Sequence, residues 1–244
     1  MQEKKLDLKF ALSINIENKD AVAVNCRMVW EKERHLITER EYAVYVSALA
    51  GIEALLRERE EIHIKTPVII GVDGRCGSGK TYFAKQLANR FLSNVIHMDD
   101  FYLPMEMRAA DWEHISGGNM DFERLLAEVL CPLKECRQAV YSPYDCKEGK
   151  YGEPKELQKK PLVVVEGSYS GHPLLAGQYN LRLFFTCSQK EQEKRLRARE
   201  GNRYAAFAMR WIPLEEAYFA RYAIERGSNL IIDTSGLCDC GRRY

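Results

Sequence analysis

One eight-residue segment constrains this chain more than any other part of its sequence. Residues 74–81 match the pattern G-x-x-x-x-G-K-[ST] at every fixed position. An apolar run at 68–72 precedes the segment, and an amphipathic helical pattern over 83–91 follows it. A phosphate-binding loop requires this order, with a strand entering and a helix leaving. The sequence therefore predicts a P-loop, in which backbone N–H groups and a helix N-terminus surround an anion.

The chemistry of the loop predicts a nucleoside triphosphate ligand. We expect Lys80 to bridge the β- and γ-phosphates and the Thr81 hydroxyl to bind Mg²⁺. ATP and Mg²⁺ are thus the expected cofactors, and the loop residues that hold them are Gly74, Arg75, Cys76, Gly77, Ser78, Gly79, Lys80 and Thr81. Cys76 has two interpretations: a thiol whose pKa is lowered by Lys80 and nearby amides, or a tolerated residue at a variable position. The second is favoured.

The chain beyond the loop has the pattern of an α/β protein. Continuous apolar runs occur at 68–72, 95–98, 162–165, 181–185 and 230–232, with helical patterns between them. Such runs are typical of parallel strands covered on both faces. We therefore expect a P-loop NTPase domain over 66–244, built as a three-layer sandwich around a central parallel sheet. The polar, Lys-rich stretch 141–160 is expected to be a surface excursion that carries substrate contacts.

Residues 1–62 follow a different pattern. Apolar residues alternate with mostly polar ones over 6–16 and again over 22–30, which predicts a β-hairpin. The pair Thr38 and Glu41 then forms a capping box before a helical pattern. We expect a small ββα accessory unit, whose helix could cover the hairpin. An apolar hairpin face left exposed would instead form a homo-oligomer interface.

Composition excludes several kinds of partner. The 244 residues carry a formal net charge of +1, without the strongly basic balance of a nucleic-acid binder. No apolar run reaches the length of about 18 residues that spans a membrane, and the first residues lack a secretory signal. We expect a cytoplasmic protein with a small-molecule substrate. Its eight cysteines are expected as reduced thiols, because their spacing fits no zinc site.

The residues after the second apolar run indicate what accepts the phosphoryl group. Asp99 and Asp100 follow 95–98, and the carboxyl ends of parallel strands face the ligand crevice. A carboxylate there can orient and deprotonate an attacking hydroxyl. Because neighbouring side chains on an extended strand point in opposite directions, we expect one of the pair to face the ligand and the other to cap a turn.

A basic segment at about 188–210 is the predicted lid. Ser188 and Glu191 form a second capping box, and little apolar content follows. A lid that closes over the phosphates would neutralise developing charge and exclude water. For most of these basic residues a solvated helix with ion pairs is the favoured interpretation. They are Lys190, Lys194, Arg195, Arg197, Arg199 and Arg203.

These motifs together resemble the uridine kinase family of P-loop nucleoside kinases, which is related to phosphoribulokinase. Asp99 to Tyr102 resembles the family's D-x-F-Y motif, which implies Asp99 as the catalytic base and Tyr102 in the acceptor pocket. Glu166 and the glycine after it resemble an E-G motif, which implies a magnesium-side carboxylate. Arg199 and Arg203 resemble the lid arginines. The resemblance covers about residues 67–235 and implies Lys80, Arg199 and Arg203 as catalytic partners of Asp99.

The resemblance also implies where the acceptor binds. Glu113 and His114 lie in a stretch similar to the family's substrate segment, with Glu113 at the position of a ribose-binding Asp. Tyr144 and Asp145 are similar to the Y-D pair of its base-binding hairpin. The chain departs from the family in the spacing after His114 and in lacking a histidine shortly after Y-D. The acceptor thus stays open between a nucleoside and a phosphoribulose-, pantothenate- or nicotinamide riboside-like metabolite. A regulatory P-loop NTPase without an acceptor is the other alternative.

Overall fold

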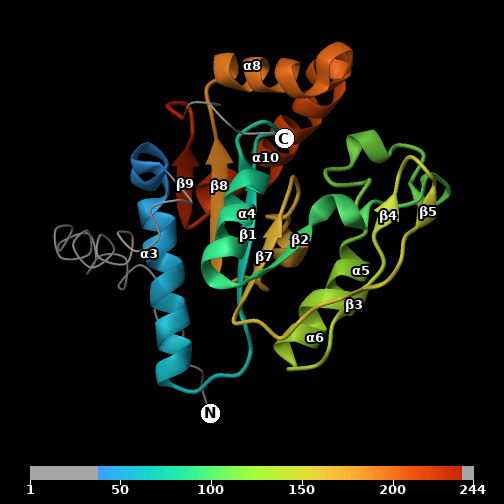
Figure 1. Cartoon of the computed structure of the whole chain (residues 1–244). Coiled ribbons are helices and arrows are strands. Elements are labelled where there is room, and N and C mark those ends of the chain that lie inside the picture. Colours follow the sequence, from blue (N-terminus) through green and yellow to red (C-terminus); the bar gives the residue numbers. More distant parts are fainter. Residues whose placement is uncertain (1–37, 238–244) are drawn as a thin grey trace.

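The central feature of the fold is a five-stranded parallel sheet. The computed structural model describes residues 38–237, in which the strands lie in the order β2–β7–β1–β8–β9 (Figure 1). In that order their bounds are Asn94–His97, Leu162–Glu166, Val68–Gly74, Leu181–Thr186 and Leu230–Asp233. Every adjacent pair is parallel, and each strand contains or overlaps one of the five predicted apolar runs. The predicted parallel sheet is confirmed.

Alternate strand residues face two apolar cores, which makes the fold three layers deep. In β1, Val68, Ile70 and Val72 face one core, whereas Ile69 faces the other. The first core is closed by α3 (Glu39–Glu61) and α4 (Lys80–Phe91). The second is closed by α5 (Phe122–Leu125), a π turn (Leu126–Leu130), α6 (Cys131–Lys134), α7 (Pro173–Ala176), α10 (Ile212–Tyr222) and α11 (Ile224–Gly227). Alternation along strands covered on both faces thus produces the sandwich.

Helix α3 covers the main sheet. Its predicted capping box is present: the Glu41 N–H donates to Thr38 Oγ1 at 3.2 Å, and the Thr38 N–H donates to Glu41 Oε2 at 2.9 Å. Its buried residues Tyr45, Leu49 and Ile52 lie in the same core as β1 and β8. The buried face of this helix therefore packs on the main sheet. The hairpin and the proposed oligomer interface lie outside the described residues, so the boundary at 62–66 stays a prediction.

The order of the strands places a crevice at the carboxyl end of β1. The chain leaves β1 for the far edge strand β2, returns through β7 beside β1, and then crosses to β8 and β9 on the other side. Connections that diverge in this way open a crevice at the strand ends, where ligands of α/β proteins bind. The predicted phosphate loop follows β1 and therefore lies at this crevice.

The predicted surface excursion is a long bent hairpin. Its outer rungs are β3 (Val140–Tyr141) and β6 (Lys155–Glu156), and its inner rungs are β4 (Tyr144–Asp145) and β5 (Lys150–Tyr151). The hairpin projects to the right of the sheet in Figure 1. The Asp100 carboxylate connects it to the end of β2, because its Oδ2 accepts from the Tyr141 hydroxyl at 2.9 Å and from Lys155 Nζ at 3.0 Å.

The chain between β8 and β9 is almost entirely helical. It comprises α8 (Gln189–Glu200), a 3₁₀ turn (Gly201–Arg203), α9 (Tyr204–Ala206), a π turn (Phe207–Trp211), α10 and α11. Backbone angles stay helical at the junction, with φ −71° at Trp211 and −61° at Ile212, so 204–222 is one continuous helical run. Within 38–237 no helix has both the length and the apolar content to cross a membrane.

The packing of α3 on the sheet predicts a large effect of its buried face on stability. Ile52 is fully buried, whereas Ile62 at the end of the same helix is 57% exposed. We expect Ile52→Ala to lower the free energy of unfolding by about 2–5 kcal/mol, because it leaves a cavity in the core. Ile62→Ala is the matched control and should change it by less than about 0.5 kcal/mol. Urea denaturation measures both, and equal small effects would contradict the packing.

Candidate active site

The phosphate loop begins where β1 passes close to β8. Gly74 has φ +132°, and a Cβ atom there would lie 2.0 Å from the Phe185 carbonyl oxygen. Only glycine combines this backbone angle with this approach. The loop ends at Gly79, which has φ +94° and precedes the first helical residue, Lys80. The loop therefore leads directly into the N-terminus of a twelve-residue helix, where anions are favoured.

The backbone N–H groups of the loop form two sets. In the first set the Cys76 N–H donates to Glu215 Oε2 at 2.9 Å, and those of Gly74, Arg75 and Ser78 also bind protein oxygens. The second set comprises the N–H groups of Gly77, Gly79, Lys80 and Thr81. Within the described part of the chain none of these four donates to an acceptor. Donors grouped at a helix N-terminus can share one anion. The open donors are therefore those of Gly77 and of residues 79–81.

Lys80 folds over the loop that precedes it. Its ammonium group donates to the carbonyl oxygens of Gly74 at 2.5 Å and Arg75 at 3.1 Å. Although the side chain is largely buried, it also lines the cleft. A phosphate bound to the open amides would offer this ammonium group a charged acceptor instead of two carbonyls, which is the stronger interaction.

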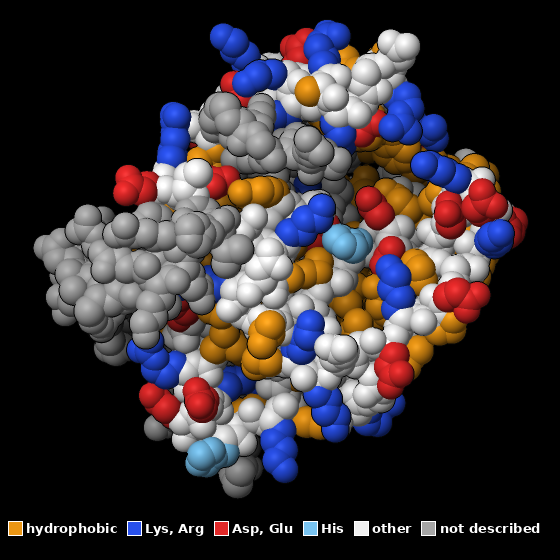
Figure 2. All heavy atoms as spheres, viewed as in Figure 1, with side chains coloured by type: hydrophobic (Ala, Val, Ile, Leu, Met, Phe, Trp, Pro, Cys, Tyr) orange, Lys and Arg blue, Asp and Glu red, His pale blue; other side chains and the backbone are white. Residues whose placement is uncertain are grey.

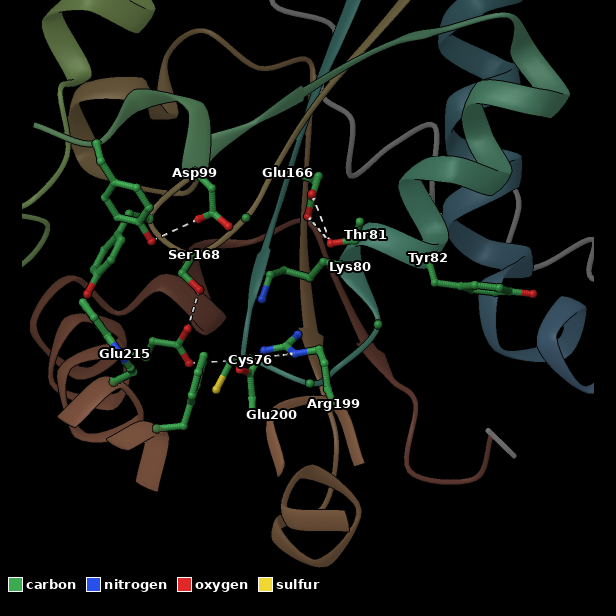
Figure 3. Close-up of a pocket in the computed structure, with 17 residues that line it drawn as sticks. Cys76, Lys80, Thr81, Tyr82, Asp99, Glu166, Ser168, Arg199, Glu200 and Glu215 are labelled. Carbon is green, nitrogen blue, oxygen red and sulfur yellow. Dashed lines mark hydrogen bonds and ion pairs between the residues drawn. The ribbon is translucent and has the colours of Figure 1, made fainter. Parts of the chain in front are cut away.

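Thr81 and Glu166 form an oxygen-rich pair at the end of β7. The Thr81 hydroxyl lies 3.1 Å from Glu166 Oε1 and 3.2 Å from Oε2 (Figure 3). His97 Nδ1 lies 2.5 Å from the same carboxylate, and this hydrogen bond raises the pKa of His97. A hydroxyl and a carboxylate are ligands that Mg²⁺ accepts while it keeps several waters. The pair therefore fits Mg²⁺, although no group of three candidate ligands occurs within 38–237.

Asp99 faces Lys80 and Glu166 across the cleft. It lies in the 3₁₀ turn Met98–Phe101 after β2, and the Tyr102 hydroxyl donates to its Oδ1 at 3.1 Å. The carboxylate is accessible from the cleft, yet surrounding protein displaces water and raises the pKa of Asp99, with a further contribution from Glu166. A raised pKa brings a carboxylate closer to the range suited to a general base.

These groups line one cleft of about 390 Å³ between the loop, β7 and the helical run after α8 (Figure 3). In Figure 2 the surface is hollowed between α8 at the top and the hairpin at the right, and basic side chains gather over α8. Residues of the predicted site that line the cleft are Cys76, Gly77, Gly79, Lys80, Thr81, Asp99, Tyr102, Glu166 and Arg199.

The predicted lid arginines differ in position. Arg199 lines the cleft, with its Nε 2.8 Å from Glu200 Oε1. Arg203 is 71% exposed and binds the other oxygen of Glu200 at 2.9 Å, outside the cleft lining. The expectation of a solvated helix fails at Arg195, which is 1% exposed and donates to Gly77 O and Thr234 Oγ1. Helix α8 is thus fixed to the loop by a buried guanidinium group.

The guanidinium group of Arg75 lies away from the cleft, and the thiol of Cys76 is not activated. Arg75 forms a bidentate ion pair with Glu216, with N–O distances of 2.7 and 3.1 Å, and donates to Thr186 Oγ1 at 2.7 Å. Its guanidinium group is therefore not part of the cleft lining. Burial and the nearby Glu215 raise the pKa of the Cys76 thiol. The suggestion of a lowered pKa at Cys76 is therefore wrong, in line with the favoured interpretation.

Four predicted acceptor residues do not reach the cleft lining. Glu113 is ion-paired with Arg210, and His114 is exposed in the same 3₁₀ turn, Trp112–His114. Tyr144 is buried against Tyr151, with ring centroids 5.3 Å apart. The Asp145 carboxylate accepts from two backbone N–H groups of the hairpin turn, which lower its pKa. Their roles toward an acceptor stay predictions.

Sequence reasoning assigned no role to three buried residues that hold the site together. Asp73, 2% exposed, accepts from the N–H groups of Gly74 and Gly171, each at 2.7 Å. Its Oδ2 also accepts from the Tyr218 hydroxyl at 2.7 Å. Glu215, 6% exposed, accepts from the Cys76 N–H and from the Ser168 hydroxyl. The sequence feature that could have indicated a role for Asp73 is a charged residue at the end of an apolar strand. The sequence around Glu215 and Tyr218 contains no such feature.

Two solved kinase structures share the fold of this chain. A possible uridine kinase from Bacillus stearothermophilus superposes with a TM-score of 0.56 at 19% identity, covering 75% of this chain and 97% of that one. A proposed fructose transport system kinase from Silicibacter superposes with a TM-score of 0.51 at 18% identity, covering 74% and 98%.

Three curated proteins are similar to this chain in sequence. Uridine kinase of Ureaplasma parvum is 27% identical over 142 residues, which cover 53% of this chain and 67% of the relative. The uridine kinase of Ureaplasma urealyticum is 25% identical over the same length. Inorganic pyrophosphatase TTM2 of Arabidopsis thaliana is 32% identical over 128 residues, only 18% of its length. No protein-family model matches the chain. The chain is thus similar in sequence to uridine kinases over about half of its length, and similar in fold to solved kinase structures.

Asp73 gives stability a specific pH dependence. Burial raises the pKa of Asp73 from 3.8 to about 6. Between these two values the folded state holds a proton that the unfolded state releases. The stabilisation that this proton gives is therefore complete below about pH 4 and is lost as the pH rises through about 6. Across that pH range the free energy of unfolding of the wild type should fall by up to about 3 kcal/mol relative to that of Asp73→Asn. Urea denaturation from pH 4.5 to 7 measures the difference, and a flat difference would contradict it.

Proposed function

We propose that this protein transfers the γ-phosphoryl group of ATP to a hydroxyl of a small metabolite, with a nucleoside 5′-hydroxyl such as that of uridine or cytidine as the leading acceptor. The observation that carries the proposal is the geometry of one cleft. Open backbone amides and Lys80 lie on one side, and the carboxylate of Asp99 faces them from the other. Phosphoryl transfer needs this pairing of an anion cradle with a base for the acceptor.

The phosphate side of the reaction follows from the loop. The N–H groups of Gly77, Gly79, Lys80 and Thr81 bind the phosphate chain, and the Lys80 ammonium moves from its carbonyl acceptors to the β- and γ-phosphates. Thr81 and Glu166 would hold Mg²⁺, which supplies charge neutralisation when bound. Arg199 adds a guanidinium group at the cleft wall. Arg203 reaches the phosphates only if the lid closes and it leaves Glu200.

The acceptor side depends on Asp99 and Tyr102. The acceptor hydroxyl donates its proton to the Asp99 carboxylate as its oxygen attacks the γ-phosphorus, and the bond from phosphorus to ADP breaks. The Tyr102 hydroxyl holds Asp99 in this orientation. A nucleoside acceptor is supported by the relatives, which are named uridine kinases. A sugar-like acceptor is the alternative that the fructose transport system kinase neighbour favours.

The role of Asp99 predicts a selective loss of turnover. We expect Asp99→Asn to lower kcat by about 100- to 10,000-fold, the usual contribution of general base catalysis, while the Kd of Mg·ATP stays unchanged. Asp100→Asn is the matched control, since that carboxylate binds Tyr141 and Lys155 instead of facing the cleft. Coupled ADP release and calorimetry with Mg·ATP measure the two quantities. Equal activity of wild type and Asp99→Asn would remove the proposed base.

The acceptor itself is best identified by a screen. ADP release by the wild type, with Mg·ATP and one candidate at a time, should rise well above the rate with water for one class among nucleosides, ribosides, pantothenate, sugars and pentose phosphates. The Asp99→Asn variant run in parallel is the control for contaminating kinases. Slow hydrolysis that no candidate accelerates would instead support a regulatory NTPase.

A further inference from the structure

Helix α10 holds three residues at the start of the phosphate loop. The Tyr218 hydroxyl donates to Asp73, and the Glu216 carboxylate accepts from the Arg75 guanidinium group. Glu215 accepts from the Cys76 N–H. A single helix, far away in sequence, thus fixes residues 73, 75 and 76 through three different side chains.

The same contacts extend to the loop after β7. The second oxygen of Glu215 accepts from the Ser168 hydroxyl, and Asp73 accepts from the Gly171 N–H. This loop follows Glu166, so the side that would hold Mg²⁺ and the side that would hold phosphate share one set of buried anchors. Because Glu215 and Asp73 are buried, each lost hydrogen bond would leave an unsatisfied polar group.

Helix α10 is also continuous with the wall of the cleft. Phe207, Trp211 and Glu215 line the cleft, and they belong to the uninterrupted helical run 204–222. Upstream, Arg199 and Glu200 at the end of α8 line it too. A displacement of the predicted lid would therefore be transmitted to α10, whose side chains hold the phosphate loop.

We propose that Glu215 and Tyr218 form a clasp that sets the direction of the loop's first amides and couples the lid segment to triphosphate binding. Both are positioning residues, because each acts through backbone or through Asp73 and not on the reacting atoms. The division of the amides supports this assignment: Glu215 accepts from the Cys76 N–H, whereas within 38–237 the N–H groups of Gly77 and of 79–81 have no acceptor. The coupling to triphosphate rests on the proposed function, whereas the clasp itself does not.

Amide hydrogen exchange tests the clasp without any nucleotide. In Glu215→Ala and Tyr218→Phe, the peptide covering 74–79 should exchange at least about ten-fold faster than in wild type, the factor typical of a lost hydrogen bond to a charged group. Glu215→Gln keeps an oxygen acceptor for the Cys76 N–H and should restore most of the protection. Glu193→Ala is the control, since within 38–237 this half-exposed residue pairs with Arg197 on the same helix and with no residue of the loop. Unchanged exchange in both folded clasp variants would overturn the proposal.

A second measurement tests the coupling. Mg·ATP should slow exchange over 201–211 in wild type and in Glu193→Ala, whereas Glu215→Ala, even at saturating Mg·ATP, should show little slowing and a Kd raised about ten-fold. A clasp variant with normal affinity and normal slowing would overturn the coupling. If Mg·ATP neither binds to wild type nor slows its exchange, while 74–79 still depends on Glu215, the proposed function fails and the clasp stands.

Discussion

The structure around the cleft depends on how the backbone N–H groups of one loop are satisfied. Residues 74–81 leave the buried strand β1, so their donors need partners or must face an opening. Protein oxygens take the first donors, through Phe185 O and the carboxylates of Asp73 and Glu215. Within 38–237 the N–H groups of Gly77 and of 79–81 have no acceptor, and these residues line the cleft. A bound anion would therefore satisfy the donors that the fold itself leaves open.

The two faces of the sheet contribute differently to this arrangement. Helices α3 and α4 close one core, and α4 supplies the helix N-terminus at the loop. On the other face, α10 packs Tyr218 and Phe219 into the second core while Glu215 and Glu216 reach the loop. Asp73 receives hydrogen bonds from both the β7 loop and α10. The phosphate loop is thus the point where the sheet and its second helical layer are joined by polar contacts.

Local patterns predicted the sheet well because a doubly covered strand is marked by its own continuous apolar run. Asp99 and Glu166 follow or end such strands, and Thr81 ends the loop motif; the structure places all three along one cleft. Glu215 and Tyr218 could not be found this way, because their partners lie about 140 residues away and the helix pattern is the same whatever it contacts. Burial of Arg195 was missed for a related reason: its acceptors include backbone carbonyl groups, which leave no trace in side-chain composition.

The charges that line the cleft have a consequence for what can enter it. Four acidic side chains, Asp99, Glu166, Glu200 and Glu215, outnumber the two cationic ones, Lys80 and Arg199. The carboxylates oppose a bare polyanion, above all near Glu166, where burial limits screening by water, whereas the open amides of the loop favour it. On the proposed function, a phosphate chain that carries its counterion should therefore enter this cleft more readily than one without it, and this selection needs no conformational change.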